Sequence, residues 1–392
     1  MKVILKNVVL DGRERNVVID GNVFSNTDAA ADTASDKCID CKGKAIVPAM
    51  YNAHTHASMM PMRGLGEDLP LQTWLTGYIW PFEDKMTAGD IRQGSALACR
   101  EMISSGSVFF NDMYFEIEQT IDEVVSRGMR ACIGITVMEN HSKAVLDSKM
   151  DFIRNFRDPS GLVQLAMAPH SVYTVGKERL VLSAKVAREN GLKIHIHVSE
   201  TRKEVDDCLS EHGMTPVRYL DSIGLLGPDV IAAHCVHVDR EEWDILAERG
   251  VHVCHCPCSN MKLGSGRFPY EMALESGVKM CLGTDSASSN NNLDMREEMK
   301  FAALLAKSAG NPELLPASTV MQWACENGAS AFGLKAGKIE EGYLADALLL
   351  DLENVRMKPA NDIVSSWVYA ADSSCIAAVI CDGKFIYENK NC

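Results

Sequence analysis

The sequence has no long hydrophobic run and no excess of positive charge. No segment approaches the roughly 18 uninterrupted apolar residues that cross a bilayer, so we expect no transmembrane span. Lysine and arginine together number 39 against 53 aspartate and glutamate residues, which gives a net charge of −14. Because nucleic acids and anionic membranes bind basic surfaces, we expect neither of them as a partner.

An export signal is also missing from the sequence as it stands. The opening segment MKVILKNVVLDG is short and is interrupted by Lys6 and Asp11, which does not suit the apolar core of a signal peptide. The 14 cysteines therefore predict reduced thiols in a cytoplasmic protein, not a disulfide framework. Cys254, Cys256 and Cys258 alternate along one run, a pattern typical of small buried residues.

Strand-like and helical segments alternate through the middle of the chain. With 392 residues, of which 46% are apolar, the sequence is typical of a globular protein with one large domain or two. Eight β-rich runs, each followed by a helix or a long loop, predict a (β/α)8 barrel. A doubly wound sheet would give the same alternation. The runs cover residues 45–53, 108–111, 131–136, 163–168, 193–198, 230–233, 251–254 and 279–282. Many helical segments end at a residue suited to a left-handed C-terminus, namely Gly106, Gly128, Gly191, Gly213, Gly250, Gly277 and Gly310.

Both ends of the chain instead predict short strands separated by turns such as Asp11-Gly12 and Asp382-Gly383. Neither end has enough strand to bury a core alone. We therefore expect residues 1–47 and 337–392 to form one small β-sandwich domain. Residues 48–336 would then be the barrel, a metal-dependent catalytic domain.

Histidines and one aspartate mark the ends of several predicted strands. His54 and His56 follow the first run, His197 and His234 close two later runs, and Asp285 follows the last one. Alternate residues of a strand point the same way, and a barrel gathers the C-terminal ends of its strands at one mouth. The pattern therefore predicts a metal site at that mouth.

A nitrogen and oxygen ligand set suits one divalent metal of the Zn²⁺, Fe²⁺ or Mn²⁺ type, with zinc as our first choice. Such a metal lowers the pKa of bound water from 15.7 to roughly 7 and so supplies hydroxide at neutral pH. The reaction then needs a proton donor. Glu200 lies three residues beyond His197, within reach of a bound substrate.

With these residues assembled, the chain resembles the amidohydrolase superfamily, and within it the branch of 5′-methylthioadenosine/S-adenosylhomocysteine deaminases and chlorohydrolases. The matching motifs occur in the family's order along nearly the whole chain. They include Asn52-Ala53-His54-Thr55-His56-Ala57, Trp80-Pro81-Phe82-Glu83, Ala168-Pro169-His170, His195-Ile196-His197-Val198-Ser199-Glu200, Ala233-His234, Ser259-Asn260 and Gly283-Thr284-Asp285.

The resemblance implies a role for each residue. The metal ligands would be His54, His56, His197 and Asp285, with Asp285 also taking the proton of the attacking water. His234 would contact the metal-bound hydroxide or the developing oxyanion, and Glu200 would protonate a ring nitrogen beside the attacked carbon. The matching positions in adenosine-type members place Glu83 on the ribose hydroxyls and His170 beside the ribose. The expected activity is deamination of 5′-methylthioadenosine, S-adenosylhomocysteine or 5′-deoxyadenosine to the inosine analogue and ammonia.

Two departures from the family pattern refine this expectation. The fourth strand ends in Pro169-His170 without the lysine of two-metal members, so one metal is expected. The loop at residues 137–143 lacks the arginines that members acting on S-adenosylhomocysteine offer to its amino-acid tail. A smaller apolar 5′ group suits this chain better.

Two alternative functions share these residues. The substrate could be another aminated or chlorinated heterocycle, such as guanine, a pterin or a triazine, because the ring chemistry is the same. A non-catalytic barrel scaffold is a further alternative, although it would have no physical need for six ionisable groups at one mouth. Related barrels often form dimers, so a homo-oligomer is compatible with the resemblance.

Overall fold

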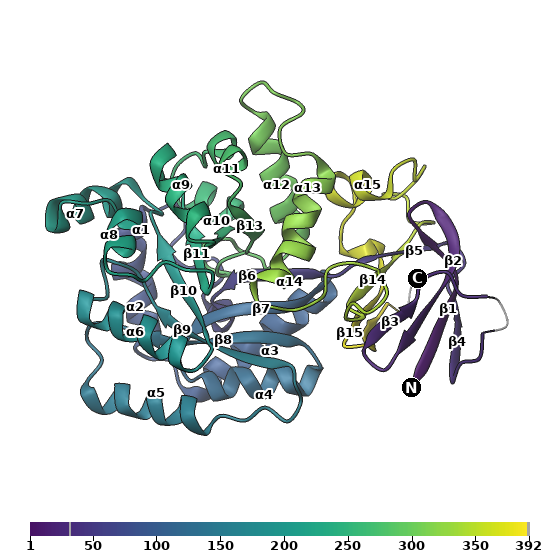
Figure 1. The fold of residues 1–392 in the computed structure, drawn as a ribbon, viewed down its shortest axis with the longest axis horizontal. Coiled ribbons are helices and arrows are strands. Elements are labelled where there is room, and N and C mark those ends of the chain that lie inside the picture. Colours follow the sequence, from purple (N-terminus) through teal and green to yellow (C-terminus); the bar gives the residue numbers. More distant parts are fainter. Residues whose placement is uncertain (31–32, 390–392) are drawn as a thin grey trace.

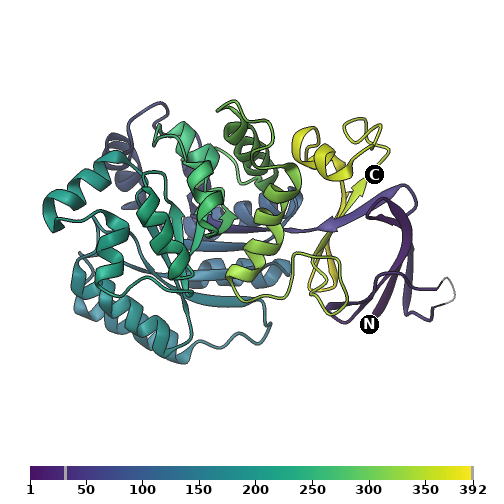
Figure 2. The same cartoon turned by 45° about the horizontal axis from the view of Figure 1, so that its top comes forward.

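The computed structural model describes residues 1–30 and 33–389, which form two eight-stranded sheets and the helices around them. Figure 1 shows the helix-rich part of the chain on one side and the strands of both chain ends on the other. The purple N-terminal and yellow C-terminal segments lie together in this view and in the rotated view of Figure 2. The parts of the chain that the structure describes contain no helix long and apolar enough to cross a membrane.

The central sheet is parallel, and its strands follow one another in sequence order. Its strands are β6 (Met50–Thr55), β7 (Ser107–Tyr114), β8 (Arg130–Val137), β9 (Val163–Pro169), β10 (Lys193–Val198), β11 (Val230–His234), β12 (His252–His255) and β13 (Lys279–Leu282). A parallel bridge between Thr55 and Asp285 joins the first strand to the segment after the last one. The sheet is therefore a nearly closed parallel barrel, as the eightfold alternation predicts.

Helices cover the outside of this barrel. They are α3 (Ala88–Ser104), α4 (Ile117–Arg127), α5 (Lys143–Asn155), α6 (Lys177–Glu189), α7 (Arg202–His212), α8 (Pro216–Ser222), α9 (Arg240–Glu248), α10 (Pro257–Lys262), α11 (Tyr270–Ser276), α12 (Met295–Lys307), α13 (Ala317–Gln322), η3 (Trp323–Asn327) and α14 (Gly328–Ala331). Local sequence sets several of their ends. Thr87 accepts a hydrogen bond from the Asp90 N–H, while the Asp90 carboxylate accepts one from the Thr87 N–H, which is a capping box at the start of α3.

A run of short helices fills the connection between β6 and α3. It comprises η1 (Ala57–Met62), α1 (Leu71–Trp74), η2 (Leu75–Ile79) and α2 (Trp80–Glu83). Met59, Met62, Trp74, Ile79 and Tyr114 form a separate apolar cluster that holds this connection against the barrel. We call residues 57–83 the covering segment.

The second sheet draws its strands from both ends of the chain. They are β1 (Lys2–Leu10), β2 (Arg13–Asp20), β3 (Val23–Asn26), β4 (Lys37–Asp40), β5 (Lys44–Pro48), β14 (Ala347–Asp351), β15 (Ile376–Cys381) and β16 (Lys384–Glu388), with α15 (Ile363–Tyr369) and η4 (Ser373–Cys375) between β14 and β15. The central antiparallel pair of β5 and β14 joins the two chain ends. This sheet has its own apolar cluster, which includes Leu5, Val17, Ile46 and Leu349.

The predicted first barrel strand at residues 45–53 is wrong in one respect, because the run divides between the two sheets. β5 ends at Pro48 in the terminal sheet, and β6 begins at Met50 in the barrel. The Ala49 N–H between them donates to the carbonyl of Asp346. An apolar run buried on both faces gives no periodic signal at such a change of partner.

Candidate metal centre and active site

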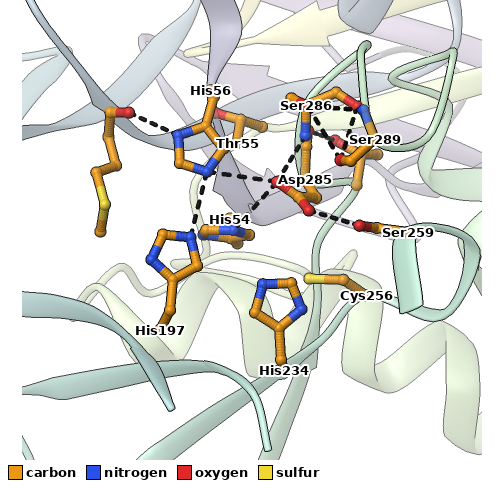
Figure 3. A network of polar contacts seen from close by, with 12 residues as sticks. His54, Thr55, His56, His197, His234, Cys256, Ser259, Asp285, Ser286 and Ser289 are labelled. Carbon is orange, nitrogen blue, oxygen red and sulfur yellow. Dashed lines mark hydrogen bonds and ion pairs between the residues drawn. The ribbon is translucent and has the colours of Figure 1, made fainter. Parts of the chain in front are cut away.

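The predicted metal ligands come from separate strand ends and meet at one mouth of the barrel. His54 lies in β6, His56 follows that strand, His197 lies in β10, and Asp285 follows β13. Asp285 Oδ1 lies 3.5 Å from His54 Nε2 and 3.4 Å from His56 Nε2. The Nε2 atoms of His56 and His197 are 3.3 Å apart. Figure 3 shows these side chains pointing toward a common centre.

Backbone carbonyls fix the direction of two of these imidazoles. His56 Nδ1 lies 2.7 Å from the Met113 carbonyl oxygen, and His197 Nδ1 lies 2.8 Å from that of His170. A carbonyl oxygen only accepts hydrogen bonds, so Nδ1 of each ring carries the proton. In the neutral form of either ring the lone pair is therefore on Nε2, which faces the centre and is free to bind a cation.

His54 supplies the observation that tests whether a metal fits. Its Nδ1 lies 2.7 Å from His195 Nε2, whereas its Nε2 is buried and has no hydrogen-bond partner. Burial lowers the pKa of His54 to about 4, so the ring is neutral at physiological pH. A buried nitrogen without a partner is costly, and a bound cation would satisfy it. The residues present therefore fit a metal.

Two overlapping groups of ligand atoms lie around this nitrogen. One group contains His54, His56 and Asp285, and the other contains His54, His197 and His234. Within each group the ligand atoms lie within 4.8 Å of one another. Nitrogen and carboxylate donors of this kind suit a divalent transition metal.

Asp285 is held in the ionised form that a ligand or base requires. Burial alone would raise its pKa, but His54, His56 and His234 outweigh burial and hold the pKa well below its ordinary value. Its Oδ2 accepts a hydrogen bond of 2.6 Å from the Ser259 hydroxyl. Its backbone has φ of 62°, an unusual conformation for a residue other than glycine. Such strain is typical of functional positions.

His234 lies between the ligands and Glu200. Its Nδ1–H donates to Asn260 Oδ1 at 2.8 Å, and its Nε2 lies 4.0 Å from Glu200 Oε2. Burial alone would lower the pKa of His234, but the carboxylates of Glu200 and Asp285 raise it above its ordinary value. Both His234 and Asp285 face the same centre in Figure 3. This imidazole can therefore accept or release a proton at the mouth.

Glu200 is a buried acid with few partners. The Ser265 hydroxyl donates to its Oε1 at 3.3 Å, and burial raises the pKa of the Glu200 carboxyl above its ordinary value. A carboxyl with a raised pKa keeps its proton closer to neutral pH and can act as an acid. Glu200 can therefore donate a proton to a group bound in the cavity.

Glu204, in the first turn of α7, holds the backbone on which Glu200 sits. Its carboxylate accepts hydrogen bonds of 2.8 Å from the N–H groups of both Ser199 and Glu200. Ser199 has φ of 50°, so this turn is strained as well as buried. The two hydrogen bonds fix the point from which the Glu200 side chain enters the mouth.

A cavity of about 780 Å³, including its opening to solvent, leads to these groups. His56, His197, His234, Glu200 and Asp285 all line it. The covering segment and the loops after β7 and β8 form the opposite wall.

Glu83 and His170 also line this cavity. Glu83 Oε1 accepts a hydrogen bond of 2.8 Å from the Tyr114 hydroxyl, and burial raises the pKa of Glu83. Burial also lowers the pKa of His170 to about 3, so this imidazole is neutral. Both side chains can offer polar atoms to a bound molecule.

Sequence reasoning assigned no role to five residues that support this site, namely Tyr114, His195, Glu204, Asn260 and Ser265. For His195 a signal was present, because it lies two residues before His197 in the same strand and faces the same way. Tyr114 ends β7, Glu204 and Asn260 lie in α7 and α10, and Ser265 follows α10, so no single sequence period links these four residues to the site.

Comparison with known proteins places the chain in a well-populated group. The amidohydrolase family profile matches residues 45–386. A 5-methylthioadenosine/S-adenosylhomocysteine deaminase from Haloarcula marismortui is 42% identical over 362 residues, covering 91% of this chain and 84% of the relative. A 5′-deoxyadenosine deaminase from Methanothermobacter thermautotrophicus is 42% identical over 383 residues, covering 95% and 89%.

Among solved structures, an adenosine deaminase from Xanthomonas campestris with bound zinc superposes with a TM-score of 0.91. It is 32% identical and covers 98% of this chain and 92% of its own. A guanine deaminase from C. acetobutylicum with bound guanine has a TM-score of 0.87 at 24% identity and covers 98% of both chains, so that likeness concerns the fold alone.

Proposed function

Because the chain belongs to the amidohydrolase family, we propose that it is a metal-dependent hydrolytic deaminase of an adenosine-type nucleoside. The enzyme is a hydrolase that acts on a C–N bond. It replaces the amino group of the purine by oxygen and releases ammonia. Its substrate is a small molecule of the kind named for the relatives: 5′-methylthioadenosine, S-adenosylhomocysteine or 5′-deoxyadenosine. The buried acid Glu200 beside the ligand cluster is the observation that carries the proposed chemistry.

The metal in this proposal is held by His54, His56, His197 and Asp285, and His234 remains free to meet the reacting water. One divalent ion is proposed, with zinc first and iron or manganese as alternatives. When bound, a divalent metal supplies an activated water at neutral pH. The free Nε2 of His54 and the ionised state of Asp285 support this assignment.

The side chains then move protons around the attacked carbon. Glu200, whose carboxyl pKa is raised by burial, donates its proton to the ring nitrogen beside that carbon and makes the carbon electrophilic. Asp285 accepts the proton of the attacking water. His234, oriented by Asn260, contacts the developing oxyanion and passes a proton to the leaving amino group. The tetrahedral carbon then expels ammonia and leaves the keto product, while its hydroxyl proton returns to Glu200 and the proton held by Asp285 returns to His234.

Substrate binding uses the same cavity. The Glu83 carboxylate, already oriented by Tyr114, accepts hydrogen bonds from the ribose hydroxyls, and His170 lies beside the sugar. A carboxylate that accepts from two vicinal hydroxyls favours a nucleoside over a free base. The substrate series consists of 5′-methylthioadenosine, S-adenosylhomocysteine, 5′-deoxyadenosine, guanine, a pterin and a chlorotriazine. Ammonia release is measured for the amino compounds and chloride release for the chlorotriazine.

Replacing Glu200 tests the proposal. Glu200→Gln keeps the shape of the side chain but removes its transferable proton, and we expect kcat for ammonia release from 5′-methylthioadenosine to fall about 10²–10⁴-fold. Metal content should stay unchanged, because Glu200 is not a proposed ligand. The matched control is Glu211→Gln, a side chain that is 73% exposed. Near-normal turnover in Glu200→Gln would contradict the acid role, and no ammonia from any substrate in the series would contradict the deaminase.

The remaining proposals concern the whole chain. Residues 1–47 and 337–392 form a β-sandwich domain beside the catalytic barrel of residues 48–336, which the separate apolar cluster of the terminal sheet supports. We also propose a cytoplasmic homo-oligomer. A cytoplasmic location suits the many free cysteines that the structure describes.

A further inference from the structure

The cavity wall away from the proton-transfer groups is apolar and aromatic. Much of it comes from the covering segment and from the residues after β7 and β8. These side chains are Met59, Leu71, Trp74, Leu75, Ile79, Trp80, Phe115, Met138 and Leu263. A thioether or a methyl group gains favourable contacts with aromatic and methionine side chains of this kind.

Away from the proposed metal, the cavity offers acidic groups but, in the part of the chain that the structure describes, no permanent cation. Its carboxyl groups are those of Glu83, Glu200 and Asp285, and no lysine or arginine is among the described residues that line it. The remaining titratable groups with basic character are imidazoles at the reaction centre. A substrate carboxylate or phosphate in the part of this cavity away from the proposed metal would therefore lose its hydration without gaining a permanent cation.

Two cations that bond to residues of the cavity wall are not themselves among its lining residues. The Lys149 ammonium donates to the Thr136 carbonyl at 2.9 Å and to the Thr136 hydroxyl at 3.2 Å. Arg179 donates to the Met138 carbonyl at 2.5 Å and pairs with Glu139 at 3.5 Å. Thr136 and Met138 line the cavity, whereas the two cations stand behind them.

We propose that this enzyme selects adenosines with a small, uncharged 5′ group, such as hydrogen or methylthio, and discriminates against a zwitterionic amino-acid tail. This inference rests on the proposed function and chooses among the substrates named for its relatives. The apolar wall favours the small group, and the missing cation disfavours the tail carboxylate. We expect kcat/KM for S-adenosylhomocysteine to be at least about 10-fold below that for 5′-methylthioadenosine.

The test separates the effect of the charge of the 5′ group from the effect of its length. We would measure kcat/KM with the metal-loaded enzyme for 5′-deoxyadenosine, 5′-methylthioadenosine, 5′-butylthioadenosine and S-adenosylhomocysteine. The butylthio compound has a tail of similar length without charge, so it should be used better than S-adenosylhomocysteine. Equal or better use of S-adenosylhomocysteine overturns the inference while leaving the deaminase intact. Absence of ammonia from all four adenosines overturns the proposed function and this inference with it.

A substitution in the wall provides the second measurement. Met138→Arg places a guanidinium in the cavity, and we expect the ratio of kcat/KM for S-adenosylhomocysteine to that for the butylthio compound to rise about 10-fold. Met138→Leu is the matched control and should keep the wild-type ratio. An unchanged ratio in a folded Met138→Arg enzyme overturns the charge argument. If this variant does not fold, the comparison of the four substrates in the wild-type enzyme still tests the proposed selectivity for a small, uncharged 5′ group.

Discussion

At the residue scale, each proposed histidine ligand has a hydrogen-bond partner at one ring nitrogen, which leaves the other ring nitrogen available to a metal. His54 depends on His195, which is fully buried inside the barrel. His195→Phe should keep the ring volume but remove this partner, and we expect metal affinity to fall about 10–100-fold. Metal content after dialysis against a series of chelator concentrations measures the effect. His212→Gln, far from the site on α7, is the control, and wild-type metal retention in His195→Phe would contradict the positioning role.

A second residue-scale prediction concerns Glu298 on α12, which is buried away from the cavity. Burial raises its pKa from 4.5 to about 8. The folded state therefore binds a proton more tightly than the unfolded state, so the free energy of unfolding falls as pH rises between about 4.5 and about 8 and then levels off. Glu298→Gln removes this titration and should flatten that part of the pH dependence.

Urea unfolding of Glu298→Gln and of the wild type at several pH values would measure this difference. The exposed Glu248→Gln is the matched control. If the variant and the wild type lose stability in parallel across the window, Glu298 is not protonated in the folded state.

Some of these site residues could be predicted from the sequence, and others could not. The strand-end positions of His54, His197 and Asp285 could be predicted because a period of two fixes their direction. The role of Glu204 could not be predicted in this way. The segment Thr201-x-x-Glu204 has the form of a capping box, and Thr201 does accept from the Glu204 N–H. The Glu204 side chain, however, turns to the buried N–H groups before the helix, because those groups have no strand partner.

At the element scale, the turn between β10 and α7 carries Glu200 and depends on Glu204. Glu204→Ala leaves two buried N–H groups without an acceptor, at a cost of about 1–3 kcal/mol each. Glu204→Gln keeps one oxygen and should lose less. Because Glu200 is displaced, we expect kcat to fall more than KM changes in both variants, and the acid limb of the pH–rate profile to move. Unfolding and pH–rate measurements together check this, and a loss of stability with an unchanged pH profile would assign Glu204 a purely structural role.

Helix ends and barrel strands were the most predictable elements. All seven glycines predicted at helix ends have positive φ, as a left-handed helix end requires. The covering segment was not predicted as helical, because Gly64, Gly66 and Gly77 interrupt it and its helices are only four to six residues long. Such short helices are stabilised by tertiary contacts, here the apolar cluster around Trp74, and not by local propensity.

At the scale of the whole molecule, a buried ionic network joins the terminal sheet to the barrel. Arg130 at the start of β8 donates to Asp346 at 3.1 Å and to Asp382 at 2.5 Å, and the Tyr51 hydroxyl also donates to Asp346. Arg130→Met would leave the buried Asp346 carboxylate with only neutral donors, the Tyr51 hydroxyl and the Asp382 N–H. We expect the free energy of unfolding to fall by about 3–5 kcal/mol.

Urea unfolding measures this loss, and the control is Arg240→Met. Arg240 pairs with Glu275 at the surface, where both side chains are more than half exposed, so about 0–1 kcal/mol is expected. A similar small loss in Arg130→Met would show that the two sheets are held together mainly by apolar contacts.

The contact between β6 and the segment after β13 closes the barrel, and it also sets when the proposed metal centre can form. Asn52 and Thr284, 232 residues apart, exchange two hydrogen bonds beside the bridge between Thr55 and Asp285. A growing polypeptide on the ribosome carries the three imidazoles long before the aspartate emerges. The complete set of proposed ligands therefore exists only after synthesis has passed the last barrel strand, so all four can bind the ion only in a chain whose barrel strands are all made.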